Sequence, residues 1–223
     1  MEREAETIGG RTSRGPEHGL LPSFAALAGS RFDPADVDPR IADFYERTSA
    51  WRLDFWSEWS PAAWPFGRAI AAMWSQRLQQ LSLPMRPLDV SFGMDSEVVH
   101  LHDAVGEVVG AAWQRTMRKT GATVYSGLYG TTTLPGSSQP SVRAVFPLPR
   151  GSLAVFLSSS ADENGGFVPI AEHFHLYVDE DGDVRTDHSL RLWNIPAVRL
   201  HYRMRPSVGR GTGLTAQLLV ASS

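Results

Sequence analysis

The residue types that could support chemistry are a carboxylate, an imidazole, a phenol and a guanidinium in the second half of the chain: Glu97, His188, Tyr202 and Arg115. Each of them alternates with apolar side chains along a segment in which hydrophobic residues recur at every second position. Because residues two apart in a β-strand point to the same face, the four groups are predicted to converge on one interior.

A carboxylate inside a fold must be paired or neutralised, and a raised pKa is what a general acid or base needs. Glu97 is therefore the predicted general base, His188 its proton partner, and Tyr202 a hydrogen-bond donor from the next strand. Arg115 would fix the ionisation of Glu97 or bind an anionic group of a substrate. A second interpretation stays open, in which Glu97 and Arg115 form a structural ion pair and His188 is a satisfied core residue.

Two further residues are predicted to contact a substrate. Trp113 alternates with Arg115 along the same segment, and its large ring would supply apolar contact area. Asp95 lies two positions before Glu97, near the expected mouth of the interior.

Two His-x-His runs are the densest source of metal ligands: His100-Leu101-His102 and His173-Phe174-His175. On a strand, the two imidazoles of each run share a face and could contribute to a metal site. Alternatively the imidazoles lie on solvated faces, because the residues that alternate with them are the more apolar ones. We expect the second arrangement, and therefore neither a metal nor another cofactor.

Charged residues gather near the last predicted hairpin. Asp179-x-Asp181-Gly182-Asp183 resembles the start of a calcium loop, but its glycine is misplaced and no closing glutamate follows at the required distance. Five arginines form a stripe that is predicted to be a hydrated outer face, with steering of an anionic ligand as the alternative. They are Arg185, Arg191, Arg199, Arg203 and Arg205.

Composition excludes several classes of site and partner. The 223 residues include no cysteine, which rules out disulfides, thiolate zinc sites, iron–sulfur clusters and a cysteine nucleophile. The net charge of -3 argues against nucleic acid as the main partner, because phosphate neutralisation normally needs a marked basic excess. No apolar run approaches the ~18 residues needed to span a bilayer, and the first residues lack the pattern of a secretory signal. A cytoplasmic protein with no membrane partner is therefore expected.

The elements that must position these groups change character near residue 90, where the hydrophobic period shortens to two. Nine alternating runs are separated by turn-forming residues such as Asp181-Gly182. This pattern predicts a mainly β fold of the α+β class, an antiparallel meander of eight to ten strands over 94–221 that is closed or nearly closed into a barrel. Closure is expected because a long open sheet would leave exposed edges. The predicted strands span 94–102, 107–118, 122–133, 141–147, 151–158, 167–178, 183–193, 197–205 and 213–221.

Two helices are predicted before the strands, over 38–48 and 65–81. Asp38 can cap the first helix, and Pro39 can take its first position, where the missing N–H costs nothing. Both helices are expected to lie on the sheet or to cover one of its ends.

The remaining segments define the domain organisation. Residues 1–30 show no sustained period and are predicted to be a flexible N-terminal arm, which leaves 31–223 as a single domain. The segment 51–66 contains four tryptophans, which could serve a large core or an exposed hydrophobic surface.

The predicted function follows from an aromatic-rich interior that holds a few polar groups. We expect the protein to bind a small, partly apolar organic molecule in a pocket inside the barrel. Cofactor-free acid/base or electrostatic catalysis of the cyclase, isomerase or lyase type is slightly favoured. Two alternatives are a non-catalytic binding protein or carrier, and a protein–protein module that uses the Trp-rich segment 51–66.

Overall fold

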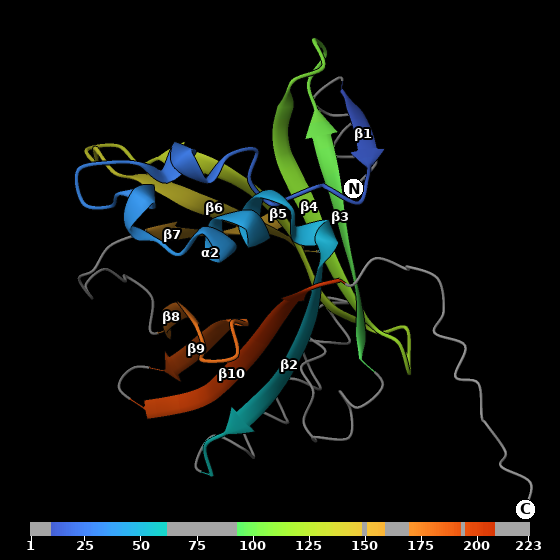
Figure 1. Ribbon diagram of the computed structural model, residues 1–223, viewed down its shortest axis with the longest axis vertical. Helices are drawn as coiled ribbons and strands as arrows, with labels where there is room; N and C mark the ends of the chain where they lie inside the picture. The colour runs from blue at the N-terminus through green and yellow to red at the C-terminus, as the bar shows by residue number, and fades with distance from the viewer. Residues whose placement is uncertain (1–9, 62–92, 149–150, 159–169, 193–194, 208–223) are drawn as a thin grey trace, which may run out of the picture.

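The computed structural model describes residues 10–61, 93–148, 151–158, 170–192 and 195–207. Within these ranges the chain is mainly β and forms two antiparallel sheets (Figure 1). The mainly β, antiparallel character predicted from the alternating pattern is therefore confirmed.

The larger sheet has six strands in the order β1-β3-β4-β5-β6-β7. Turns that follow β4 and β5 contain Gly121 and Gly136 at φ angles of 67° and 79°, a conformation that glycine tolerates because it has no Cβ. The strand bounds are β1 (Arg11–Arg14), β3 (Met94–His102), β4 (Val108–Met117), β5 (Thr123–Thr133), β6 (Pro140–Leu148) and β7 (Gly151–Ser158).

The smaller sheet has four strands in the order β2-β10-β9-β8. Its first strand comes from the N-terminal part of the chain and pairs with the last described strand, from Trp51 opposite Pro206 to Trp59 opposite Val198. The bounds are β2 (Trp51–Trp59), β8 (Ile170–Val178), β9 (Val184–Leu192) and β10 (Ile195–Pro206).

The predicted closed or nearly closed meander is wrong for the described residues. Eight of the predicted strands are present as β3 to β10, but the chain leaves the first sheet after β7 and starts the second with β8. Hydrophobic alternation shows which face of a strand is buried, but it does not show which strand is its neighbour. Alternation therefore does not indicate where one sheet ends and the next begins. The ninth predicted strand, 213–221, lies outside the described residues.

One of the two predicted helices falls within the described residues. It is α2 (Pro39–Glu46), and the Asp38 carboxylate caps it by accepting a hydrogen bond of 2.9 Å from the backbone N–H of Arg40. The other predicted helix, over 65–81, lies outside the described residues. Three short 3₁₀ helices accompany α2: η1 (Phe24–Leu27), η2 (Pro34–Asp36) and η3 (Thr48–Ala50).

Part of the predicted flexible arm belongs to the folded core. From residue 10 onward the segment is described, and its strand β1 pairs with β3 while η1 contacts β6. Leu20 and Leu21 are only 1% and 0% exposed. The arm prediction therefore fails over 10–30, because this segment buries side chains at irregular spacing and carries no helical or strand period to recognise.

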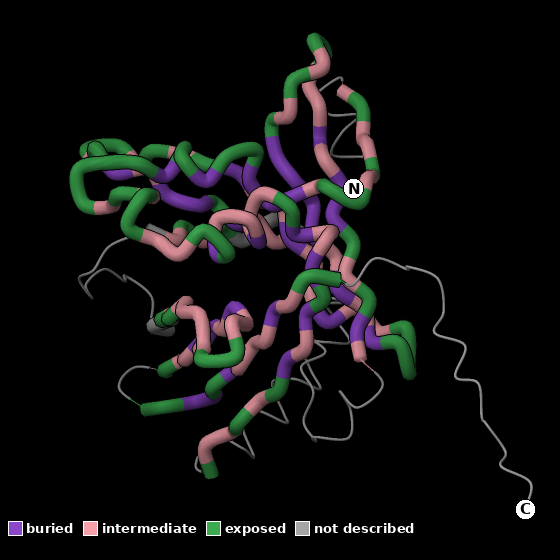
Figure 2. Tube along the Cα trace, viewed as in Figure 1, coloured by how far each residue is buried: buried purple, intermediate pink, exposed green. Residues whose placement is uncertain are grey.

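The apolar core lies between the two sheets and includes the N-terminal segment. Phe44 of α2 joins the layers, because its ring meets Trp51 of β2 and Trp113 of β4 edge-on at centroid distances of 5.9 and 6.3 Å. Figure 2 shows buried residues along the strands and exposed residues gathered at the turns. Among the described residues, no helix has the length and apolar character needed to cross a membrane.

Candidate functional site

The most unusual polar group in the core is the guanidinium of Arg115. It lies in the middle of β4, opposite Ser96 of β3 and Tyr125 of β5. Only 6% of Arg115 is exposed, although arginine is almost never fully buried unless it is paired. The alternation with Ala111, Trp113 and Met117 correctly predicted that Arg115 faces the core.

Three aromatic rings surround this guanidinium. Its central carbon lies 4.3 Å from the ring centre of Trp113, 4.4 Å from that of Tyr125 and 5.5 Å from that of Tyr202. Such contacts attract a cation to the negative face of an aromatic ring, and they strengthen when water is excluded. Because Tyr202 belongs to β10, Arg115 also connects the two sheets.

A pair of phenols completes this group. The hydroxyls of Tyr125 and Tyr129 are in hydrogen-bonding contact, and both rings lie on the face of β5 that meets Trp113. Burial raises the pKa of Tyr129 well above its usual value, with a further contribution from Tyr125 and an opposing one from Arg115. Burial also raises the pKa of Tyr45, to about 12. Tyr45 and Tyr129 are therefore neutral across the physiological range.

No carboxylate balances the charge of Arg115 within the described residues. The ion pairs found there join other arginines, or His201, to aspartate and glutamate, and Arg115 takes part in none of them. Its Nε is buried and lacks a hydrogen-bond partner in the same part of the chain. A buried cation held only by aromatic faces is suited to receive an anion.

Glu97, the predicted general base, is not in this interior. Its side chain is 51% exposed and forms a 2.6 Å ion pair with Arg14 of β1. The predicted pairing with Arg115 and the predicted inward direction of Glu97 are both wrong. On β3 the core-facing residues are Met94, Ser96 and Val98, which lie opposite the core residues Met117, Arg115 and Trp113 of β4.

The error at Glu97 has a physical cause. Val98 and Val99 are adjacent and both are buried, so β3 is covered on both faces at this point. Alternation then gives no indication of which face meets the main core. Glu97 shares a strand face with Val99 and Leu101, and the prediction that this face meets the main core was wrong by one residue.

The other predicted substrate contacts divide between the interior and the surface. Trp113 is buried beside Arg115, and its indole N–H donates a 2.7 Å hydrogen bond to the hydroxyl of Ser96. Asp95 is exposed and forms a 2.7 Å ion pair with Arg118. Asp95 therefore lies on the surface with Glu97.

His188 and Tyr202 do share the interior face of the smaller sheet, as their alternation predicts. His188 is 9% exposed and stacks on Phe174 of β8, with ring centroids 3.8 Å apart. Tyr202 stacks on Phe55 of β2 at 5.7 Å and reaches Arg115 across the core. Their predicted catalytic roles remain predictions.

The two His-x-His runs have different environments. His173 and His175 are exposed, as the solvated-face interpretation predicts. His100 and His102 are partly buried instead, because the segment that contains β1 covers their face of β3.

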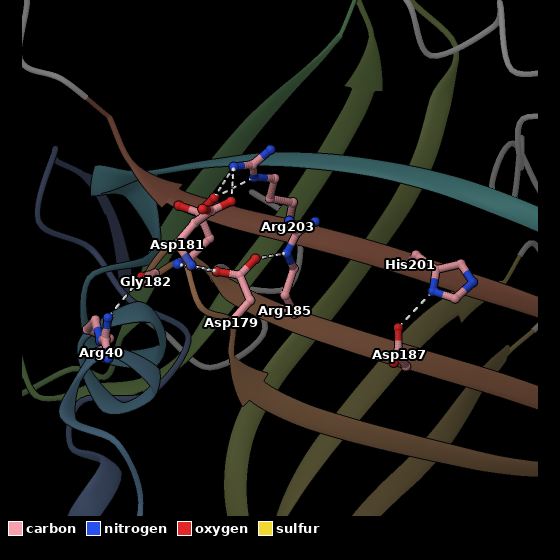
Figure 3. Close-up of polar contacts among 9 residues, drawn as sticks. Arg40, Asp179, Asp181, Gly182, Arg185, Asp187, His201 and Arg203 are labelled. Carbon is pink, nitrogen blue, oxygen red and sulfur yellow. Dashed lines mark hydrogen bonds and ion pairs between the residues drawn. The ribbon is translucent and has the colours of Figure 1, made fainter.

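Two arginines of the stripe, Arg185 and Arg203, are paired with acidic neighbours (Figure 3). Arg185 pairs with Asp179 at 2.6 Å, and Arg203 pairs with Asp183. The carboxylate oxygens of Asp179, Asp181 and Asp183 lie within 4.8 Å of one another, and Arg185 and Arg203 partly offset their charge.

Tryptophans of the segment 51–66 face both sides of β2. Trp51 is buried in the core and Trp59 is half-buried, whereas Trp56 is 39% exposed and stacks on His201 at 5.3 Å. Trp64 lies outside the described residues. The buried position of Trp51 argues against a continuous tryptophan surface for protein binding.

An open hollow of about 260 Å³ runs beside β2. Leu53, Phe55 and Met94 form its apolar wall, and Phe55 also stacks on Tyr202. Its other lining residues are Arg52, Asp54, Trp56 and Gly93. The aromatic wall of the hollow is therefore continuous with the rings around Arg115.

Tyr125 and Tyr129 are the site residues that sequence reasoning missed. The run Tyr125-x-Gly127-x-Tyr129 carries a usable signal, since period two places both phenols on one face with a glycine between them. The position of Tyr125 opposite Arg115 could be known only from the register of β4 with β5.

Comparison of the chain with family models, with curated proteins and with solved structures finds no match. The function must therefore be argued from the chemistry of the site.

Proposed function

We propose that this protein binds a small, partly apolar organic anion between its two sheets, without acting on it chemically. The single observation that supports the proposal is the buried guanidinium of Arg115, enclosed by aromatic rings and without a carboxylate partner in the described residues. A carboxylate or similar anion on the ligand would supply the missing charge.

Energetics favour an anion over a neutral ligand at this position. Removing a cation from water costs several kcal/mol, and cation–π contacts return only about 0.5–2 kcal/mol each. A charge-assisted hydrogen bond to a bound anion is shorter and roughly twice as strong as a neutral one. The hydroxyl pair of Tyr125 and Tyr129 adds polar groups beside Arg115, while the surrounding rings suit an apolar ligand body.

A binding role is preferred to catalysis because of where the acidic residues lie. Glu97 was the predicted base, and it is at the surface in an ion pair with Arg14. His188 and Tyr202 remain on the interior face, where they can contribute contacts to a ligand.

Thermal-shift and calorimetric titrations can test the proposal. Benzoate, phenylacetate and hexanoate would be compared with the neutral benzamide, phenylacetamide and hexanamide. We expect the anions to stabilise the protein and their amides to do so weakly or not at all. Replacing Arg115 with methionine should weaken anion binding by about ten- to a hundredfold, the range of a charged hydrogen bond.

Two matched variants provide controls. Arg143→Met removes an exposed arginine from β6, and Glu97→Gln removes the surface carboxylate. Both should bind the anions as the unmodified protein does. Equal binding of acids and amides, or unchanged binding by a folded Arg115→Met variant, would contradict the proposal.

A further inference from the structure

Three histidines gather where the N-terminal segment crosses β3. The ring of His18 stacks on that of His100, with centroids 3.9 Å apart and planes at 4°. His102 lies further along the same face of β3, its ring 6.4 Å from that of His100. This group lies outside the predicted acid/base site and is separate from the Arg115 cluster.

Hydrogen bonds from two of these rings hold the N-terminal segment in place. His100 Nε2 donates to the carbonyl of Gly19 at 2.9 Å. His102 Nδ1 donates to the carbonyl of Gly106 at 3.0 Å, so in the neutral ring Nε2 accepts from the Ser13 hydroxyl at 2.7 Å.

A second proton on the ring of His18 would be poorly accommodated. His18 Nδ1 is buried without a hydrogen-bond partner among the described residues, so a proton there would lack an acceptor. Burial, followed by the charges of His100 and His102, lowers the pKa of His18, against a smaller opposing effect of a hydrogen bond to the backbone of Ser13. Burial lowers the pKa of His100, the hydrogen bond to the Gly19 carbonyl opposes this shift, and the charge of His102 adds a smaller lowering.

Nearby carboxylates form contacts with other residues and do not offset the lowered pKa values of His18 and His100. Among the described residues no carboxylate forms an ion pair with His18, His100 or His102. Glu97 and Glu17 pair with Arg14 and Arg47, while the carboxylates of Asp103 and Glu46 accept backbone N–H groups. On β4, the partners of His100 and His102 are the uncharged Ala111 and Val108. Arg11 lies opposite His102 in the register of β1 with β3, and Glu107 follows Gly106, whose carbonyl accepts the hydrogen bond from His102.

We propose that His18 and His100, which lie beside His102, form a proton-sensitive clasp, which holds residues 11–21 on β3 when the imidazoles of His18 and His100 are neutral and releases them in mild acid. Release would withdraw Leu20 and Leu21 from the core. The clasp rests on its own contacts and does not depend on the proposed ligand.

The direction of the pH effect follows from the lowered pKa values. In the closed state the pKa values of His18 and His100 lie below the ordinary value of 6.5, which applies once the segment is released. As the pH falls, the released state therefore binds protons before the closed state does. The clasp is at full strength above about pH 6.5 and weakens as the pH falls below that value.

Amide hydrogen exchange at about pH 7.5 and about pH 5.5, corrected for intrinsic exchange rates, tests the clasp. We expect peptides from residues 11–27 to lose at least about tenfold in protection at the lower pH. Peptides from 170–192 should change little. The variant His18→Phe keeps a stacking ring that cannot titrate, so its pH step should be clearly smaller. His173→Gln, which removes an exposed imidazole, should behave as the unmodified protein.

Three results would overturn the proposal. They are equal protection of 11–27 at both pH values, an equal loss in all peptides, and a full pH step in His18→Phe. If that variant does not fold, NMR titration of the imidazole protons in the unmodified protein decides the question. Two pKa values below 6.5 support the clasp, and values at or above 6.5 for His18 and His100 refute it.

Discussion

Arg115 occupies a position where a cation is costly unless it serves a ligand. Its charge is screened by aromatic faces, and its Nε has no acceptor among the described residues. A residue retained for stability alone would be expected to have a carboxylate partner. Residues that serve binding often reduce the stability of the unliganded protein.

Replacing Arg115 with methionine should therefore stabilise the unliganded protein. Methionine has a similar length and no charge to desolvate, and replacing buried charged groups by apolar ones often gains 1–4 kcal/mol. We expect the free energy of unfolding in urea to rise by about 1–3 kcal/mol. A loss of more than about 1 kcal/mol would show that the cation–π contacts are structural.

At the scale of elements, the N-terminal segment depends on a close approach of two backbones. A Cβ on Gly19 would lie 2.1 Å from the carbonyl carbon and oxygen of Glu46, at the end of α2. Gly19 is also the residue whose carbonyl accepts the hydrogen bond from His100. The path of the segment past α2 therefore requires glycine at this position.

Gly19→Ala should weaken the docking of this segment. We expect a loss of about 1–3 kcal/mol in the free energy of unfolding, the usual cost of forcing extra atoms into a packed site. The control is Gly130→Ala in β5, where the nearest atom to an added Cβ is the Val109 carbonyl oxygen at 3.7 Å. Equal urea midpoints for both variants would contradict the close packing at Gly19.

At the scale of the whole molecule, the N-terminal segment acts as part of the core that joins the sheets. Its η1 contacts β6 of the larger sheet, whereas α2 contacts β8 of the smaller one. The pairing of β2 with β10 adds a second long-range connection between early and late parts of the chain. Unfolding is therefore expected to involve both sheets together.

Leu21→Ala tests this role of the segment. Leu21 is fully buried, so its truncation should lower the free energy of unfolding by about 2–5 kcal/mol. Val105→Ala, at a position that is 82% exposed, is the control and should change it by less than about 0.5 kcal/mol. A negligible effect of Leu21→Ala would instead agree with the flexible arm that the sequence suggested.

Local patterns in the sequence were sufficient for the elements that depend on near neighbours. Period-two alternation located eight strands, and Asp38-Pro39 located the start of α2, because capping and strand faces are properties of a few adjacent residues. The same alternation placed Arg115, His188 and Tyr202 correctly on interior faces, where one face of the strand is clearly apolar.

Tertiary structure decided which elements meet, and with that the composition of each site. The division into two sheets, the pairing of β2 with β10 and the burial of Leu20 and Leu21 depend on contacts between distant residues. Glu97 was misplaced because β3 is covered on both faces, a condition set by segments far away in the sequence. The same holds for the His18–His100 stack and the rings around Arg115, since a local pattern specifies a face but not the partner that covers it.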